Sequence, residues 1–120
     1  MAGRLCVLAL ALLSFQPALA QSGRVAILQG LDKVTARIST IEAPLDERVA
    51  FGTLRITVRN CNKRPPEEFP ETTAFLVILD EKRDETVSLI FSGWMFASSP
   101  ALSALEHPVY DIWVKDCVVR

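Results

Sequence analysis

Strict alternation of apolar and polar residues occurs in three segments of the chain, and this period of two is typical of half-buried β-strands. The segments are residues 34–40, 54–59 and 110–115. Their apolar positions are Val34, Ala36 and Ile38 in the first, Leu54, Ile56 and Val58 in the second, and Tyr110, Ile112 and Val114 in the third. Because residues 42–47 form a turn-like break around Pro44, we expect the first two segments to pair as a β-hairpin with a long loop.

Ile41 and Phe51 depart from this alternation at the ends of the expected hairpin. A β-bulge at Gly52 would return both side chains to the core face, since a glycine inside a strand often marks a bulge. A second buried face would also explain their positions.

The second half of the chain predicts two more strands and one helix. Residues 74–79 are continuously apolar, which is typical of a strand covered on both faces. Residues 80–85 form a charged hairpin tip, and residues 86–91 form the returning strand. A short helix is expected over residues 98–105, where serines precede a proline, and it should stop before Pro108. The sequence thus predicts a mainly β fold, a small antiparallel β-sandwich or barrel of five to six strands with one short helix.

Residues 1–20 have the three parts of a cleavable export signal. Arg4 supplies the positive charge, residues 5–15 form a nearly continuous apolar run, and Ala18-Leu19-Ala20 provides the small residues that a signal peptidase reads. Eleven residues are too few to span the roughly 30 Å hydrocarbon core of a bilayer. We therefore expect cleavage before Gln21, a periplasmic location and no stable membrane insertion after cleavage.

The rest of the chain, residues 21–120, has a length that suits a single, mostly β domain with one core. Without Arg4 it carries 12 basic and 14 acidic side chains, a net charge of −2. This balance gives no reason to expect nucleic acid or an anionic membrane as a partner. The sequence contains no phosphate loop, dinucleotide fingerprint or Ca²⁺ loop, so no cofactor is expected.

Two cysteines, Cys61 and Cys117, remain after cleavage, since Cys6 lies within the apolar run of the signal. An even number of cysteines in an oxidising compartment predicts a disulfide. The bond would close a loop of 57 residues. Two free thiols and a metal site are the alternatives. Zinc needs three or four ligands, and only His107 is available to join the cysteines.

The densest group of aromatic and polar residues lies in residues 91–100 and 106–113, which hold both tryptophans, the tyrosine and the histidine. One interpretation is a binding surface. The other is a domain core in which Trp94 and Trp113 are the largest side chains. The residues of the binding hypothesis are Trp94, Ser98, Ser99, Glu106, His107, Tyr110 and Asp111.

A small hydrolase or a metal-dependent enzyme is the enzymatic alternative. The residues of a catalytic set would be Ser92 or Ser99, His107 and Asp111. The sequence contains neither Gly-x-Ser-x-Gly nor a glycine-rich stretch able to form an oxyanion hole. Glu106, His107 and Asp111 also offer metal ligands, but their spacing matches no strong ligand motif. We therefore expect no catalytic residues and no metal.

Two other surfaces are candidates for binding. Arg37, Arg55 and Arg59 share the outward parity of strands that we expect to be adjacent. They would form an anion-binding stripe or an ordinary solvated sheet face. Residues 60–73 form a polar, proline-rich loop, and its part from Lys63 to Glu71 is a preorganised segment that an inhibitor of an envelope enzyme would use.

Several blocks of the chain together resemble one known family. The blocks are Leu31-Asp-Lys-Val, Phe51-Gly-Thr-Leu-Arg-Ile-Thr-Val-Arg-Asn-Cys61, Arg64-Pro-Pro66, Ala74-Phe-Leu76, Phe91-Ser-Gly-Trp-Met-Phe-Ala-Ser-Ser-Pro100 and His107-Pro-Val-Tyr-Asp-Ile-Trp113 with Cys117. The pattern resembles domain-of-unknown-function family twenty-one fifty-five, short exported proteins typical of alphaproteobacteria. The resemblance covers nearly all of residues 21–120, and it implies a periplasmic location and no assigned activity.

The sequence therefore favours a non-enzymatic periplasmic binding or envelope-assembly module. Its partner is expected to be another envelope protein or a cell-wall component. The small hydrolase or metal-dependent enzyme and the inhibitor or regulator of an envelope enzyme are kept as alternatives.

Overall fold

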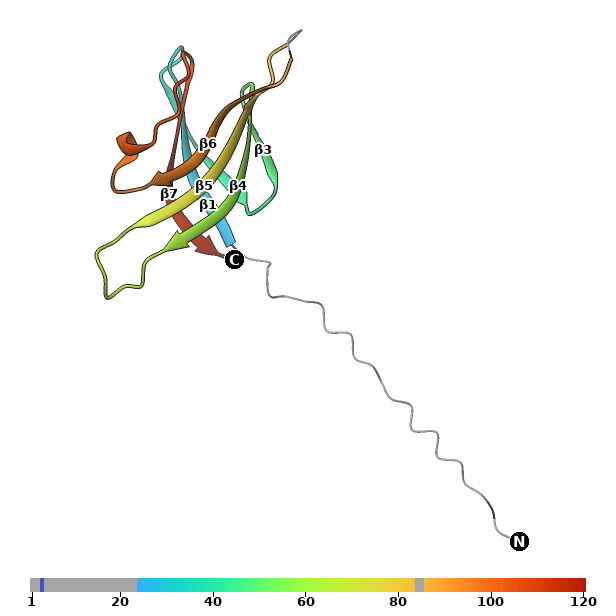
Figure 1. Ribbon diagram of the computed structural model, residues 1–120, viewed down its shortest axis with the longest axis vertical. Helices are drawn as coiled ribbons and strands as arrows, with labels where there is room; N and C mark the ends of the chain where they lie inside the picture. Colours follow the sequence, from blue (N-terminus) through green and yellow to red (C-terminus); the bar gives the residue numbers. More distant parts are fainter. Residues whose placement is uncertain (1–2, 4–23, 84–85) are drawn as a thin grey trace.

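The computed structural model describes Gly3 and residues 24–83 and 86–120, so the predicted signal peptide, residues 1–20, lies almost entirely outside the described residues. These residues form seven strands and one short 3₁₀ turn, shown in Figure 1. The strands are β1 (Arg24–Asp32), β2 (Arg37–Pro44), β3 (Arg48–Phe51), β4 (Leu54–Lys63), β5 (Thr72–Asp80), β6 (Ser88–Phe96) and β7 (Tyr110–Val119), and the 3₁₀ turn η2 is Pro100–Leu102.

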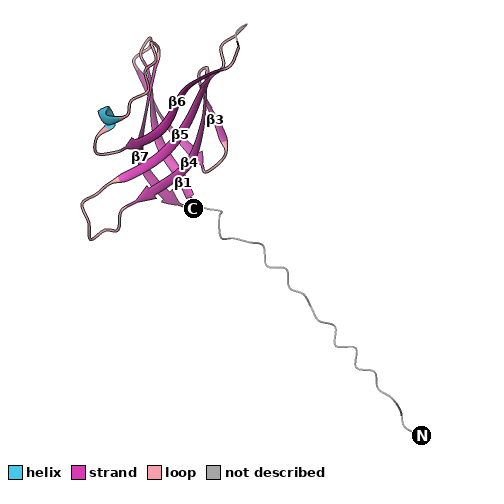
Figure 2. Ribbon diagram, viewed as in Figure 1, coloured by secondary structure: helices cyan, strands magenta, loops and turns pink. Residues whose placement is uncertain are grey.

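The strands make two antiparallel sheets that face each other (Figure 2). Sheet A has the order β2-β1-β7, and sheet B has the order β3-β4-β5-β6. Every hydrogen-bonded pair is antiparallel. The predicted mainly β fold is confirmed, with seven strands in the described residues where the sequence pattern gave five to six.

The core lies between the sheets and is built from alternate residues of each strand, because successive side chains point to opposite faces. The fully buried large side chains are Leu28 from β1, Leu54, Ile56 and Val58 from β4, Leu76 and Ile78 from β5, and Val114 from β7. Helices long and apolar enough to cross a membrane are absent from the described part of the chain.

The expected hairpin between residues 34–40 and 54–59 is wrong. Val34 and Ala36 lie in the β1–β2 turn, where Val34 is 77% exposed and Ala36 has a φ of 56°. The carboxylate of Asp32 accepts the backbone N–H groups of Val34 and Thr35, at 2.9 and 3.3 Å. This side-chain-to-backbone bonding favours a turn over a strand. Val34 and Ala36 therefore do not belong to a strand, and β2, which contains Ile38, pairs with β1 instead.

Gly52 is a turn residue and not the predicted bulge. It has a φ of 57° and lies between β3 and β4, which pair directly. Glycine adopts this left-handed conformation without steric cost. Ile41 and Phe51 still reach the core, because they come from separate strands in different sheets. Phe51 departs from the alternation of residues 54–59 because it belongs to a separate strand, β3, which the sequence analysis did not predict.

Two other expectations change in the second half. Residues 74–79 are buried on one face only, since Phe75, Val77 and Leu79 are half-exposed on the other. The expected helix over residues 98–105 is reduced to η2. Leu105 is 5% exposed and packs in the core, so the chain must leave a helical path to insert it.

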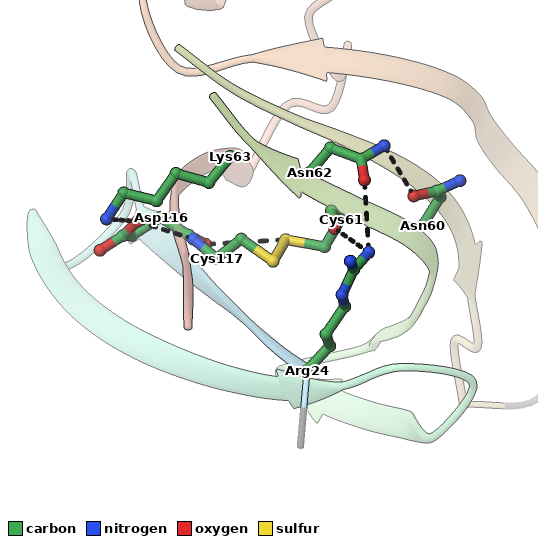
Figure 3. The surroundings of a disulfide bond; sticks show 7 residues. All are labelled: Arg24, Asn60, Cys61, Asn62, Lys63, Asp116 and Cys117. Atoms are coloured by element: carbon green, nitrogen blue, oxygen red, sulfur yellow. Dashed lines mark hydrogen bonds and ion pairs between the residues drawn. A yellow bond between two sulfur atoms is a disulfide. The ribbon is translucent and has the colours of Figure 1, made fainter. Parts of the chain in front are cut away.

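The disulfide between Cys61 of β4 and Cys117 of β7 is confirmed, and it links the two sheets at one end (Figure 3). The two Cα atoms are 5.9 Å apart, within the usual range for a disulfide. The Arg24 guanidinium donates to the Cys61 carbonyl at 3.2 Å, and the Lys63 ammonium lies 2.9 Å from the Asp116 carboxylate. Hydrogen bonds with Lys63 lower the pKa of the Asp116 carboxyl despite its partial burial.

We predict that the Cys61→Ala/Cys117→Ala double variant loses about 4 kcal/mol of unfolding free energy, because the bond restricts a 57-residue loop in the unfolded chain. Urea unfolding followed by tryptophan fluorescence measures this loss. A thiol reductant should lower the stability of the wild type to that of the variant and leave the variant unchanged. Equal stability of the oxidised wild type and the variant would contradict the structural role of the bond.

Candidate functional site

The seven residues of the predicted binding surface do not form one surface. Ser98 lies at the end of the sandwich that carries the disulfide, where it contacts Glu71. Asp111 lies at the opposite end, where its carboxylate is 3.1 Å from the Lys33 ammonium. We call these the disulfide end and the histidine end. The separation follows from β7, which runs from Tyr110 at one end to the disulfide at the other.

The other predicted residues divide in the same way. Trp94 is on β6, 41% exposed, with its ring edge-on to Phe75 of β5 and the centroids 5.4 Å apart. Ser99 starts η2, and Glu106 is exposed on the segment that crosses to β7. Tyr110 packs its ring against Phe51, with centroids 5.3 Å apart. Trp94 therefore lies on the outer face of sheet B, whereas Tyr110 packs against the core.

His107 is buried and fully bonded. Its side chain is 7% exposed, and its Nε2 atom lies 2.9 Å from the Asp80 carboxylate. Its Nδ1 atom accepts the backbone N–H groups of Val109 and Tyr110, at 3.0 and 3.2 Å. Because Nδ1 accepts two hydrogen bonds, the proton of the neutral ring lies on Nε2 and is donated to Asp80.

Asp80 is the buried acid that the sequence analysis missed. It was placed in a charged tip, but its side chain is 4% exposed. The hydroxyl of Thr53 donates to its Oδ1 at 2.7 Å, and Lys82 lies 3.9 Å from its Oδ2. The sequence did contain a sign of its burial, because Asp80 lies at an even spacing from Ala74, Leu76 and Ile78, the buried residues of β5.

The environment of Asp80 favours its ionised form. Burial alone raises the pKa of the carboxyl, but the hydrogen bonds from Thr53 and His107, with the nearby positive charge of Lys82, outweigh it and lower the pKa below its usual value. At neutral pH the Asp80 carboxylate is therefore ionised and hydrogen-bonded to His107, which stabilises the folded state.

The structure does not bring together the residues of the hydrolase or of the metal-dependent enzyme. Both ring nitrogens of His107 have hydrogen-bond partners, and none of these partners is a serine. Asp111 pairs with Lys33 and not with the ring. A serine nucleophile needs a base within hydrogen-bond reach. Groups of three acidic, histidine or cysteine side chains able to hold a metal are absent from residues 24–83 and 86–120.

The three arginines of the predicted anion stripe are not on adjacent strands. Arg37 belongs to sheet A, and Arg55 and Arg59 belong to sheet B. Arg55 pairs with Glu81 at 3.2 Å, and Arg59 pairs with Asp46 at 3.1 Å. The premise of a common stripe is therefore wrong, because the hairpin that would align the strands does not form.

An apolar stripe covers the outer face of sheet B. Trp94 lies opposite Phe75, and Leu89 lies opposite Leu79, across the β5–β6 pair. Directly opposite residues share a face of the sheet, and Val77 has the same parity on β5. Leu89 is 62% exposed. We define the apolar stripe as Phe75, Val77, Leu79, Leu89 and Trp94. None of the five is part of the buried core cluster.

The loop between β4 and β5, residues 64–71, projects at the disulfide end (Figure 1). Its two ends are joined by the Arg64 N–H, which donates to the Glu71 carbonyl at 3.0 Å, and a turn is closed by the Glu68 N–H and the Pro65 carbonyl, also at 3.0 Å. The Glu71 carboxylate accepts both the N–H and the hydroxyl of Ser98. These bonds with Ser98 lower the pKa of the Glu71 carboxyl. The loop is thus tied to the residues that follow β6.

A groove of about 650 Å³ lies between this loop and the ends of β6 and β7. Its apolar lining is contributed by Pro65, Pro66, Pro70 and Ala97, and charged side chains, among them Arg64 and Lys115, line the remainder. Ser98 is the one residue of the predicted binding set that lines it.

Comparison with known proteins places the chain in a family. Residues 26–117 match the family described as "Uncharacterized protein conserved in bacteria (DUF2155)", and the chain belongs to this family, as its sequence blocks indicated. It is similar to "Uncharacterized protein RP359" of Rickettsia prowazekii (strain Madrid E), with 37% identity over 87 residues. The match covers 72% of this chain and 56% of the relative, so the chain spans little more than half of that protein's length. No solved structure gives a significant match.

We predict that Asp80→Asn costs about 2 kcal/mol of unfolding free energy near neutral pH, since it removes the charge-assisted bonds with His107 and Thr53. The folded pKa of Asp80 is lowered, so its contribution is present above the unfolded pKa and is lost as the pH falls through the folded pKa. The difference between wild type and variant should therefore be constant above about pH 5 and shrink below about pH 4.

Urea unfolding of both proteins across this pH range measures the difference. Asp111→Asn is the control, because its pair with Lys33 is exposed and should contribute less than about 1 kcal/mol. A pH-independent difference between wild type and Asp80→Asn would refute the assignment of a stabilising buried carboxylate.

Proposed function

We propose that this chain is a non-enzymatic module of the periplasm that binds another envelope protein through the apolar stripe on sheet B. The observation that carries the proposal is the mismatch between the sequence of β5 and its surroundings. Residues 74–79 have the composition of a strand covered on both faces, but the described part of the chain fully covers only one of them. A partner that packs on the stripe would supply the second cover.

The composition of the stripe supports a protein partner. Contiguous exposed apolar side chains on a soluble domain often mark protein–protein contacts. Tryptophan is enriched among the residues that dominate binding energy, and Trp94 is 41% exposed beside Phe75 on the β5–β6 pair. Arg55, which lies opposite Leu79 of the stripe on β4, is already paired with Glu81, so a partner need not desolvate an unpaired charge at this position.

The position of the chain in the cell is part of the proposal. Residues 1–20 have the pattern of a cleaved export signal, and the disulfide is of the kind that persists in oxidising compartments. A non-enzymatic role is supported by the bonded state of His107, whose two ring nitrogens are committed to Asp80 and to backbone N–H groups.

We predict that a photoreactive amino acid at exposed position Ser92, between the stripe residues Leu89 and Trp94, forms a defined covalent adduct in intact cells of the native host. Mass spectrometry identifies the attached protein. The same probe at Val34, which is equally accessible but lies in the β1–β2 turn, should not form this adduct.

The variant Leu89→Asp should abolish the Ser92 adduct, because burying a carboxylate in an apolar contact is costly. Since Leu89 is 62% exposed, the unfolding free energy should change by less than about 1 kcal/mol. Undiminished adduct in a folded Leu89→Asp protein would show that the stripe is not the contact surface. A complete lack of adducts from Ser92 would contradict the binding role.

A further inference from the structure

Phe69 is the most exposed large apolar side chain of the described residues, at 87%. It lies in the β4–β5 loop, directly before Pro70. The loop contains three prolines and is closed by the two backbone hydrogen bonds described above. A ring on a loop that is already ordered loses little conformational freedom on docking. The structure therefore presents one aromatic ring to solvent on a preorganised support.

The groove beside the loop is not filled by this ring. Phe69 is not among the groove's lining residues, although Pro66 and Pro70 of the same loop are. The volume of about 650 Å³ lies within the range of sites that bind small ligands, and three prolines and one alanine form the apolar part of the lining. The same chain thus carries an exposed aromatic ring and, next to it, an apolar recess.

The unpaired charges beside the ring are mainly negative, and those of the recess are mainly positive. Glu67 and Glu68 precede Phe69, and neither has an ion-pair partner in the described part of the chain. Within the groove, Lys63 is neutralised by Asp116 and Glu71 is engaged by Ser98. The cations Arg64 and Lys115 have no ion-pair partner among residues 24–83 and 86–120. Glu68 also lines the groove, and Arg64 also lies beside Phe69, so each side carries one charge of the other sign.

We propose that two copies of the chain associate about a two-fold axis, with Phe69 of each copy in the groove of the other. In such a dimer each patch meets the complementary patch of its partner, so both rings are buried in one contact. Glu67 and Glu68 of one copy then approach Arg64 and Lys115 of the other. The contact uses no residue of the apolar stripe, so the outer face of sheet B remains accessible in the dimer. The test of the dimer is therefore independent of the test of the proposed function.

Sedimentation equilibrium of the oxidised protein purified from cells tests the proposal. The wild type should change from monomer to dimer within a concentration range that extends to about 1 mM. Burying one phenyl ring is worth about tenfold or more in affinity, and the dimer buries two, so Phe69→Ala should weaken association about 100-fold or more. Val34→Ala, which removes an equally exposed apolar side chain elsewhere, should leave the dissociation constant unchanged.

Charge reversal gives a second, sharper test. The variant Glu67→Lys/Glu68→Lys should not dimerise, because its loop would meet the cations of an identical groove, and Arg64→Glu/Lys115→Glu should fail for the opposite reason. An equimolar mixture of the two should form a heterodimer, since both of its contacts pair opposite charges. All four residues are exposed, so folding is checked simply by an unchanged unfolding curve.

Three results would overturn the proposal. The first is a wild type that stays monomeric at every concentration, which would assign the loop to another protein, as in the inhibitor hypothesis. The second is a dimer that Phe69→Ala does not weaken. The third is a mixture of the charge-reversed variants that contains only monomers.

Discussion

The bond between Cys61 and Cys117 is the constraint on which the rest of the structure depends. Among the described residues, sheets A and B share no hydrogen-bonded pair of strands, and this bond links them covalently in addition to the connecting loops and the side-chain contacts of the core. Three of the fifteen buried core residues are alanines, Ala26, Ala43 and Ala74. A chain of this size buries a limited fraction of its surface, and a covalent link between sheets compensates for a modest core.

The two ends of the sandwich are closed by different chemistry. At the disulfide end the covalent bond fixes β4 against β7 and thereby places Lys63 beside Asp116 (Figure 3). Both of these side chains line the groove. At the histidine end the closure is polar, through the bonds of Asp80 to His107 and Thr53. This assigns the histidine a structural role. The surfaces left for function are therefore those that the chain does not use to hold itself together.

The sequence predicted the parts of the fold that depend on local pattern. The strands around residues 54–59, 74–79 and 110–115 are confirmed, because they follow from local runs or alternations of apolar residues. The disulfide is confirmed because only two cysteines follow the predicted signal. The pattern says nothing of which strand lies beside which. The hairpin and the arginine stripe that rested on it failed for this reason.

The remaining errors have equally physical causes. The turn at Val34 was missed because its cause is the carboxylate of Asp32, a side-chain-to-backbone interaction. Asp80 was placed on the surface from its charge, although its parity on β5 put it inside. Ser98 and Trp94 were grouped by closeness in sequence. In a strand four residues span about 13 Å, and the two side chains serve different surfaces. The groove could not be foreseen, since it joins residues 63–72 to residues 97–98 and 115–116.

The most direct measurement of the central claim is the intact mass of the protein isolated from its native cells, with free thiols blocked by alkylation at the moment of lysis. The account predicts a chain that begins at Gln21, carries no alkyl group and gives one disulfide-linked peptide pair containing Cys61 and Cys117. A chain that begins at Met1 with alkylated Cys61 and Cys117 would contradict it, because the sheets would then lack the covalent link in the compartment where the protein resides.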